Sequence, residues 1–193
     1  MDNYFKETLY SELIRIANSL CVHDTSLENQ NDVLDNLAIL FQNNSLKTSG
    51  YCDIYSGAGG IALFLMEVYK VNSEDKYLKS AIKILKWINI NYQSDNNLTT
   101  SFYTGTVGIT FLFFKAYQLS KNDELLSYGN EAYDFYLNQT TEINHPLDLI
   151  NGVAGEIIGL LHIHEIQKDE EIIKQIDKRF IMYPISRTVL QRS

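Results

Sequence analysis

Three pairs of glycines recur along the chain at nearly constant spacing, and this repeat constrains the fold more than any other feature. The first glycines of the pairs are 48 and then 47 residues apart, and each pair directly precedes an apolar run. An internal repeat of this length is typical of one supersecondary unit that is used several times. The six residues are Gly57 and Gly60, Gly105 and Gly108, and Gly152 and Gly155.

A second marker follows each glycine pair in the same register. An acidic residue stands 18 positions after each first glycine, at Asp75, Asp123 and Glu170. The segment before this residue is apolar nearly all round, as in "GIALFLMEVY", whereas the segment after it is amphipathic, as in "DKYLKSAIKILKWININ". A helix that is apolar on all sides is buried, and an amphipathic helix lies at the surface. Each repeat is therefore predicted to form an inner helix followed by an outer helix.

The whole chain is predicted to be all-α. Helical periodicity is present nearly everywhere, and the only prolines are Pro146 and Pro184. A length of 193 residues suits one domain. We expect entry helices within residues 1–45 (one from about Tyr4 to Leu20, the other over "NDVLDNLAILFQ"), three hairpin repeats over 46–180, and a tail over 181–193. Stacked hairpins of this kind build an α/α toroid, here an incomplete, open one.

The composition excludes several classes of partner. The net charge is −8 and no cluster of Lys and Arg occurs, which disfavours nucleic acid and anionic membranes as partners. No stretch has the roughly 18 apolar residues of a membrane span, and the N-terminus does not resemble a signal peptide. Two cysteines, Cys21 and Cys52, make neither a disulfide framework nor a zinc motif. We therefore expect a cytoplasmic protein.

The glycine pairs have two candidate roles. A phosphate-binding loop is disfavoured, because the G-x-x-G pattern lacks the Lys-Ser/Thr of a P-loop and no strand precedes it. The structural alternative uses the fact that residues three apart share one helix face, where a missing side chain lets another backbone approach. Glycine would also permit a tight turn into the inner helix. The pairs are therefore predicted to be structural, at the rim of a ring of inner helices.

The third repeat contains the segment "DLINGVAGEIIGLL", from Asp148 to Leu161. This segment resembles the D-h-h-x-G-h-[AS]-G motif, where h is apolar, of the lanthionine synthetase C-like (LanC) family. The resemblance covers residues 46–180 and corresponds to the N-terminal half of that family's α/α toroid. It implies a relative of the lanthipeptide cyclases, which add a cysteine thiol to dehydroalanine or dehydrobutyrine in a precursor peptide.

The resemblance also identifies a candidate site residue. Asp148 matches the aspartate of the family motif, to which an acid/base or orienting role in catalysis is attributed. The alternative is local capping, because Asp53 and Ser101 stand at the same distance before their own glycines. Family cyclases hold zinc with two cysteines and a histidine from later repeats, and zinc lowers the pKa of the substrate thiol. The corresponding W-C-x-G and C-H-G segments are not found, so we expect no zinc and no other cofactor in this chain.

The remaining candidates have simpler interpretations. Cys52 is expected to be a small buried hydrophobe. Cys21 and His23 lack the second pair of ligands that zinc needs. His162 and His164 are two apart on one helix, not four, so we expect at least one to pack in the core. His145 is interpreted as a loop residue near Asp148. Four aromatic residues are assigned to the core, with a peptide groove as the alternative: Trp87, Tyr103, Tyr133 and Tyr136.

Three functions stay open at this point. The first is a truncated LanC-like cyclase relative that lacks independent zinc-dependent activity. The second is a non-catalytic helical repeat module that binds a peptide or protein. The third is another α/α-toroid enzyme, such as a glycoside hydrolase, for which Asp53 and Asp148 are the nearest acidic pair. Because three repeats leave two open flanks, we expect a precursor peptide, a complementary C-terminal fragment or a second copy as partner.

Overall fold

The computed structural model describes residues 3–21, 52–139 and 146–182. Helix α1 spans Asn3–Leu20. Three helical hairpins follow, with a short 3-10 helix η1 (Tyr92–Ser94) after the first: α3 (Ala58–Asn72) with α4 (Asp75–Asn91), α5 (Thr106–Ser120) with α6 (Asp123–Gln139), and α7 (Val153–Gln167) with α8 (Glu170–Met182). No β-strand occurs within these ranges. The all-α prediction is confirmed. Helix α1 corresponds to the first predicted entry helix, and the second lies outside the described residues.

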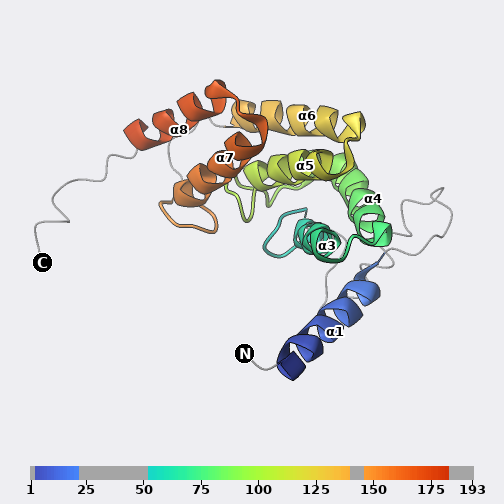
Figure 1. Cartoon of the computed structure of the whole chain (residues 1–193). Helices are drawn as coiled ribbons and strands as arrows, with labels where there is room; N and C mark the ends of the chain where they lie inside the picture. The colour runs from blue at the N-terminus through green and yellow to red at the C-terminus, as the bar shows by residue number, and fades with distance from the viewer. Residues whose placement is uncertain (1–2, 22–51, 140–145, 183–193) are drawn as a thin grey trace, which may run out of the picture.

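The hairpins follow one another along an arc (Figure 1). Helix α5 packs between α3 and α7, while α4, α6 and α8 each pack against the inner helix of their own hairpin. The structure therefore has inner helices in sequence with outer helices around them, which is the open α/α toroid-type arrangement that the repeat predicts. None of the described helices combines the length and the apolar character needed to cross a membrane.

The three inner helices end in the same way. Each is followed by a non-glycine residue in the left-handed conformation, with φ of 60° at Ser73, 58° at Lys121 and 56° at Lys168. The backbone N–H of each donates a 2.8 Å hydrogen bond to the carbonyl oxygen four residues earlier. A bond of this kind satisfies a carbonyl group at the helix end that has no partner within the helix. Each hairpin therefore turns through the same local structure.

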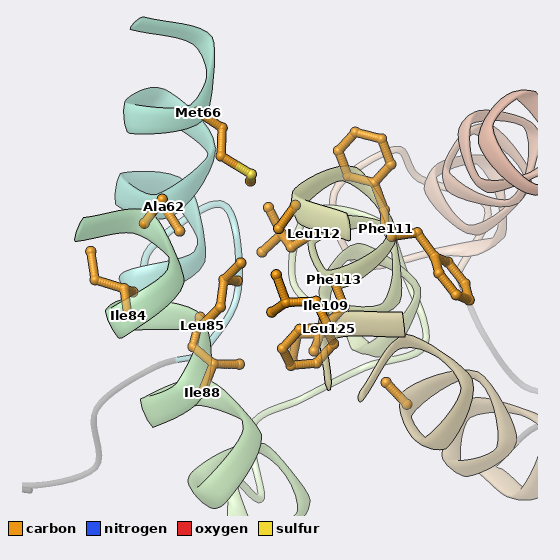
Figure 2. Packing of buried hydrophobic residues seen from close by; sticks show 14 of the residues in the cluster. Ala62, Met66, Ile84, Leu85, Ile88, Ile109, Phe111, Leu112, Phe113 and Leu125 are labelled. Carbon is orange, nitrogen blue, oxygen red and sulfur yellow. The ribbon is translucent and has the colours of Figure 1, made fainter. Parts of the chain in front are cut away.

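The hydrophobic core lies between the inner and outer helices. Figure 2 shows Met66 of α3, Leu85 of α4 and Leu112 of α5 facing one another, and all three are fully buried. Burying a side chain of this size stabilises the fold by about 1.5–3 kcal/mol. Helix α5 is buried nearly all round, since each of its residues from Thr106 to Phe114 is buried. This agrees with the prediction that the inner helices, which are apolar nearly all round, are buried.

In α5 and α7, the residue seven positions after the first glycine of the repeat faces the preceding inner helix. In α5 this position is Leu112, whose Cδ1 lies 2.9 Å from where a Cβ on Gly59 of α3 would stand. In α7 the same position, seven residues after the first glycine, is Gly159. A Cβ added to Gly159 would overlap the side chain of Val107 in α5. Helix α7 therefore contacts α5 without a side chain of its own between them at this point.

Helix α7 has an apolar flank that its neighbours do not cover. Leu161 stands nine residues after the first glycine of its repeat, as Met66 and Phe114 do in theirs. Met66 is 0% exposed and Phe114 is 3% exposed, but Leu161 is 45% exposed. Within the described residues, the third inner helix thus presents to solvent a position that is buried in the first two.

Candidate functional site

Each inner helix is preceded by a loop, and the three loops lie together at the N-terminal ends of these helices (Figure 1). We define the rim as residues 52–57, 95–105 and 146–152, and refer to these as its first, second and third loops. The candidate residues Asp53, Ser101 and Asp148 all lie on the rim, one in each loop. The repeat thus brings together positions that are far apart in the sequence.

Hydrogen bonds join neighbouring loops of the rim. The backbone N–H of Tyr55 donates to the carbonyl oxygen of Tyr103 across 2.9 Å. Thr104 Oγ1 donates to the carbonyl oxygen of Ile150 across 3.0 Å. Tyr55, Tyr103 and Ile150 occupy the same place, two residues before the first glycine of their repeats. The three loops therefore form one continuous edge, with equivalent residues side by side.

The second glycine of each pair lets its loop fold back on the start of the inner helix. A Cβ added to Gly60, Gly108 or Gly155 would overlap the carbonyl oxygen of the residue six positions earlier in the loop. None of the described glycines has a positive φ, and the first glycines cap their helices with extended backbone. These turns therefore depend on the missing side chain and not on glycine's access to the left-handed region.

The aspartates of the first and third loops hold their own loops in shape. Oδ1 of Asp148 accepts hydrogen bonds from the N–H groups of Ile150 (2.8 Å) and Asn151 (2.7 Å). Oδ1 of Asp53 accepts from the N–H of Ser56 across 2.6 Å. Asp148 is exposed, whereas Asp53 is only 5% exposed. Of the two, Asp148 is the carboxylate that a molecule outside the rim can reach.

Ser101, at the equivalent place in the second loop, makes a different contact. Its hydroxyl donates across 3.5 Å to the carbonyl oxygen of Leu149 in the third loop, and it is fully buried. The second loop lies between the other two, so Asp53 and Asp148 stand on opposite sides of it. The second loop thus separates Asp53 from Asp148, whereas a glycosidase mechanism needs two carboxyl groups that face the same substrate.

Sequence reasoning missed a buried polar network directly beneath the rim. Oε1 of Glu156 accepts hydrogen bonds from the Tyr136 hydroxyl and from Arg179 Nε, both at 2.6 Å. Thr100 Oγ1 donates to Oε2 across 3.3 Å. Burial, reinforced by the Glu156 charge, raises the pKa of Tyr136 above its ordinary value. The signal for this network was a glutamate at a place where the other two repeats have isoleucine, Ile61 and Ile109.

The network connects the second and third hairpins. Thr100 comes from the second loop and Tyr136 from α6, whereas Glu156 lies in the first turn of α7 and Arg179 lies in α8. The side chains of Arg179 and Glu156 are 6% and 1% exposed, so the ion pair is almost fully removed from water. A buried charge is stable only when it is paired and hydrogen-bonded, as both are here.

The two cysteines occupy different environments. Cys52 begins the first loop and is fully buried, as expected. Burial, together with the carboxylates of Asp95 and Asp53, raises the pKa of the Cys52 thiol to about 12. Cys21 follows α1 and is half-buried, and burial raises its pKa as well. Both thiols are therefore protonated at neutral pH.

Contrary to expectation, neither His162 nor His164 packs in the core. His162 is exposed, with its ring centroid 5.6 Å from that of Phe102 and 5.8 Å from that of Phe111. His164 is half-buried, and its Nδ1 lies 3.0 Å from the carbonyl oxygen of Asp169 in the turn after α7. The expectation of a packed core histidine is therefore wrong for both. His23 and His145 lie outside the described residues.

The four aromatic candidates divide between core and partly exposed positions. Trp87 is 6% exposed and Tyr136 is 0% exposed, so both belong to the core. Tyr103 and Tyr133 are half-buried. Tyr133 stacks on Tyr136 with ring centroids 5.8 Å apart, while Tyr103 lies on the rim. Core packing thus accounts for Trp87 and Tyr136, and Tyr103 borders the surface of the candidate site.

The described residues do not fit the zinc ion that the family resemblance implies. Zinc takes deprotonated cysteine and neutral histidine as ligands. The Cys52 thiol is held protonated, and no group of three or more His, Cys, Asp or Glu in the described ranges is placed to hold a metal ion. We therefore assign no metal-dependent step to the described residues.

The hairpins, their common turns and the interlocked rim define an α/α toroid-type repeat protein. The model of the lanthionine synthetase C-like protein family matches residues 48–187, which is well over half of the chain. The chain therefore belongs to the LanC-like family, and the resemblance found in the sequence is confirmed. No curated protein matches the sequence.

Proposed function

We propose that this LanC-like protein binds a peptide at the rim, and that the peptide is a precursor of the kind that lanthipeptide cyclases close into thioether rings. The proposal rests on the surface of the rim. Tyr55 is 65% exposed and Leu149 is 45% exposed, and the exposed Asp148 precedes Leu149 in the third loop. A surface of apolar side chains beside a fixed polar group suits a peptide ligand.

Thioether formation adds a cysteine sulfur to a dehydroalanine or dehydrobutyrine and leaves an enolate that must accept a proton. We propose that Asp148 accepts the proton that the attacking thiol loses and returns a proton to the enolate carbon, or that it orients the peptide. Its Oδ1 is fixed by two backbone N–H groups, and the side chain is exposed at the edge of the rim. A group that exchanges protons with a bound peptide must be both positioned and reachable. The thiol-activating zinc is no part of this proposal.

A non-catalytic peptide-binding module is the second candidate function. Both proposed roles of the rim need the same peptide contacts, and they differ only in whether Asp148 does chemistry. The glycoside hydrolase alternative is weaker, because Asp53 is buried and bound to Ser56, and the second loop lies between it and Asp148. The two carboxylates thus lack the common exposed cleft that glycoside hydrolysis uses.

Retention of a precursor peptide tests the proposed binding. The immobilised chain is incubated with a leader-bearing precursor that contains cysteine and dehydroalanine, and with a scrambled sequence of the same composition. We expect the precursor to be retained more strongly, and Tyr55→Ser to weaken this retention. Val71→Ser is the matched control, because Val71 is 64% exposed at the other end of α3. Equal retention of both peptides, or equal effects of the two substitutions, would contradict peptide binding at the rim.

Loss of the peptide thiol decides between the two candidate functions. Alkylation of the remaining thiols and mass spectrometry measure this loss. Thiol loss that depends on wild-type protein and disappears in Asp148→Ala supports the proposed role of Asp148. Binding without thiol loss supports the non-catalytic module. A cytoplasmic location is also part of the proposal, since a chain with two cysteines has too few of them for a disulfide framework.

A further inference from the structure

We infer that the peptide segment recognised at the rim is both apolar and positively charged. This inference rests on the proposed function, because it names the chemical class of the peptide that the rim selects. Two independent properties of the rim support it: the signs of its charges and the exposure of its apolar side chains.

The charged residues of the rim all have the same sign. Its three loops contain Asp53, Asp95 and Asp148, and no Lys or Arg. Each of the three carboxylates is fixed by backbone N–H groups, and Asp95 accepts such bonds from Cys52 (3.2 Å) and Asn97 (3.0 Å). Three fixed negative charges on one edge of the protein favour a cationic partner and repel an anionic one. The net charge of −8 for the whole chain acts in the same direction.

The apolar side chains of the rim are exposed on the same loops. In the third loop Leu147 is 65%, Leu149 45% and Ile150 36% exposed, and in the first loop Tyr55 is 65% exposed. Single exposed apolar residues are normal on a protein surface, but a cluster on connected loops is typical of a binding site. Because Leu147 and Leu149 flank Asp148 in the sequence, an occupant of this loop meets apolar and negative groups together.

The hydrogen bonds of the rim explain why this surface is available without rearrangement. Tyr55 is tied to the second loop through its backbone, and Ile150 is tied to the second loop through its carbonyl oxygen. These bonds use main-chain groups and leave the side chains of both residues exposed. A preformed surface loses less conformational entropy on binding than a flexible one.

Two labelled probe peptides test the charge selection. One contains Leu-Ser-Lys triplets, and its twin contains Leu-Ser-Glu triplets of the same length. Fluorescence anisotropy at low salt is expected to show about tenfold tighter binding of the lysine probe, with a difference that shrinks as salt is added. Equal affinity for the two probes at low salt would overturn the inference.

Substitutions locate the effect. Asp148→Asn keeps an oxygen that can accept the two backbone hydrogen bonds but removes the charge, so the lysine probe is expected to bind several-fold more weakly. The control is Asp177→Asn, which removes an exposed charge from α8 and is expected to change nothing. If the two substitutions had the same effect, the charge selection would not lie at the rim.

The outcomes separate this inference from the proposed function. If both probes bind equally and Tyr55→Ser weakens both, peptide binding at the rim stands and charge selection fails. If neither probe binds and the precursor peptide is not retained, the proposed function itself fails. If the lysine probe alone binds and loses affinity in Asp148→Asn, both are supported.

Discussion

Arg179 Nε donates a 2.6 Å hydrogen bond to Oε1 of Glu156, and this buried ion pair fastens the last outer helix to the start of the last inner helix. The equivalent of Glu156 in the second hairpin is Ile109, and the equivalent of Arg179 in the first hairpin is Ile84. Both isoleucines are fully buried. The third hairpin thus uses a polar contact where the others use apolar packing.

This relationship predicts strong non-additivity. Arg179→Met alone leaves the Glu156 charge buried without its partner and is expected to lower the free energy of unfolding by about 3–5 kcal/mol. The triple variant Glu156→Ile, Arg179→Met and Tyr136→Phe removes every member of the central contact and should cost much less than the sum of the same three changes made singly. Urea unfolding followed by circular dichroism measures both. Additive losses would show that the three side chains act independently.

A second prediction concerns Gly108. A Cβ at this position would overlap the carbonyl oxygen of Phe102, which is backbone and is held by the rim. Replacing glycine by alanine within a helix ordinarily stabilises it by about 1 kcal/mol. Here we expect Gly108→Ala to destabilise the protein by about 1–3 kcal/mol or more, because the loop must move. The sign of the change in thermal or urea unfolding is decisive, and a stabilised variant would contradict the close approach.

The thiol pKa values predict unequal reactivity. At pH 8 the buried Cys52, with a pKa raised to about 12, is expected to react with iodoacetamide far more slowly than the half-buried Cys21. Peptide mapping by mass spectrometry measures both rates, and labelling in urea is the control, where the two rates should converge. Rapid labelling of native Cys52 would show that its environment is not closed.

The same group makes the free energy of unfolding depend on pH in the alkaline range. The folded state keeps the Cys52 thiol neutral, whereas the unfolded thiol ionises above its ordinary pKa. This contribution is therefore fully present at neutral pH and is lost as the pH rises from the ordinary thiol pKa toward 12. The stability of Cys52→Ala should consequently fall less steeply over this range than that of the wild type.

The exposed flank of α7 predicts self-association of the purified chain. Leu161 is 45% exposed at a place where Met66 and Phe114 are at most 3% exposed. We expect light scattering after size exclusion to show a molar mass that rises with concentration, and Leu161→Glu to reduce it. Val71→Glu adds the same charge to a residue of similar exposure on α3 and is the control. A molar mass that stays at the monomer value at every concentration would contradict this prediction.

The sequence predicted the repeat well because its markers are local. The outer helices begin at Asp75, Asp123 and Glu170, the three residues that the 18-residue spacing identified. Each marker residue indicates where its own helix begins, so the helix start can be predicted without knowledge of the tertiary fold. The family assignment rests on the same register, and the family match over residues 48–187 confirms it.

The contacts between hairpins could not be predicted in the same way. Glu156 and Arg179 are 23 residues apart and belong to two helices, so their contact depends on how α7 and α8 pack. The exposure of His162 likewise depends on which face of α7 its neighbours cover. The role of Asp148 as a hydrogen-bond acceptor for its own loop was among the alternatives, because that interaction is local. Its proposed chemistry depends on a bound peptide.

The contrast between Leu112 and Gly159 has a consequence for the shape of the array. The turns at Ser73, Lys121 and Lys168 have nearly the same φ, so each joins its inner helix to its outer helix in the same way, and the hairpins do not differ there. The side chain at the seventh position then acts as a spacer, present between α3 and α5 and missing between α5 and α7. The volume of the residue at this one position in each hairpin thus affects how closely neighbouring inner helices approach, and with it the bend of the arc.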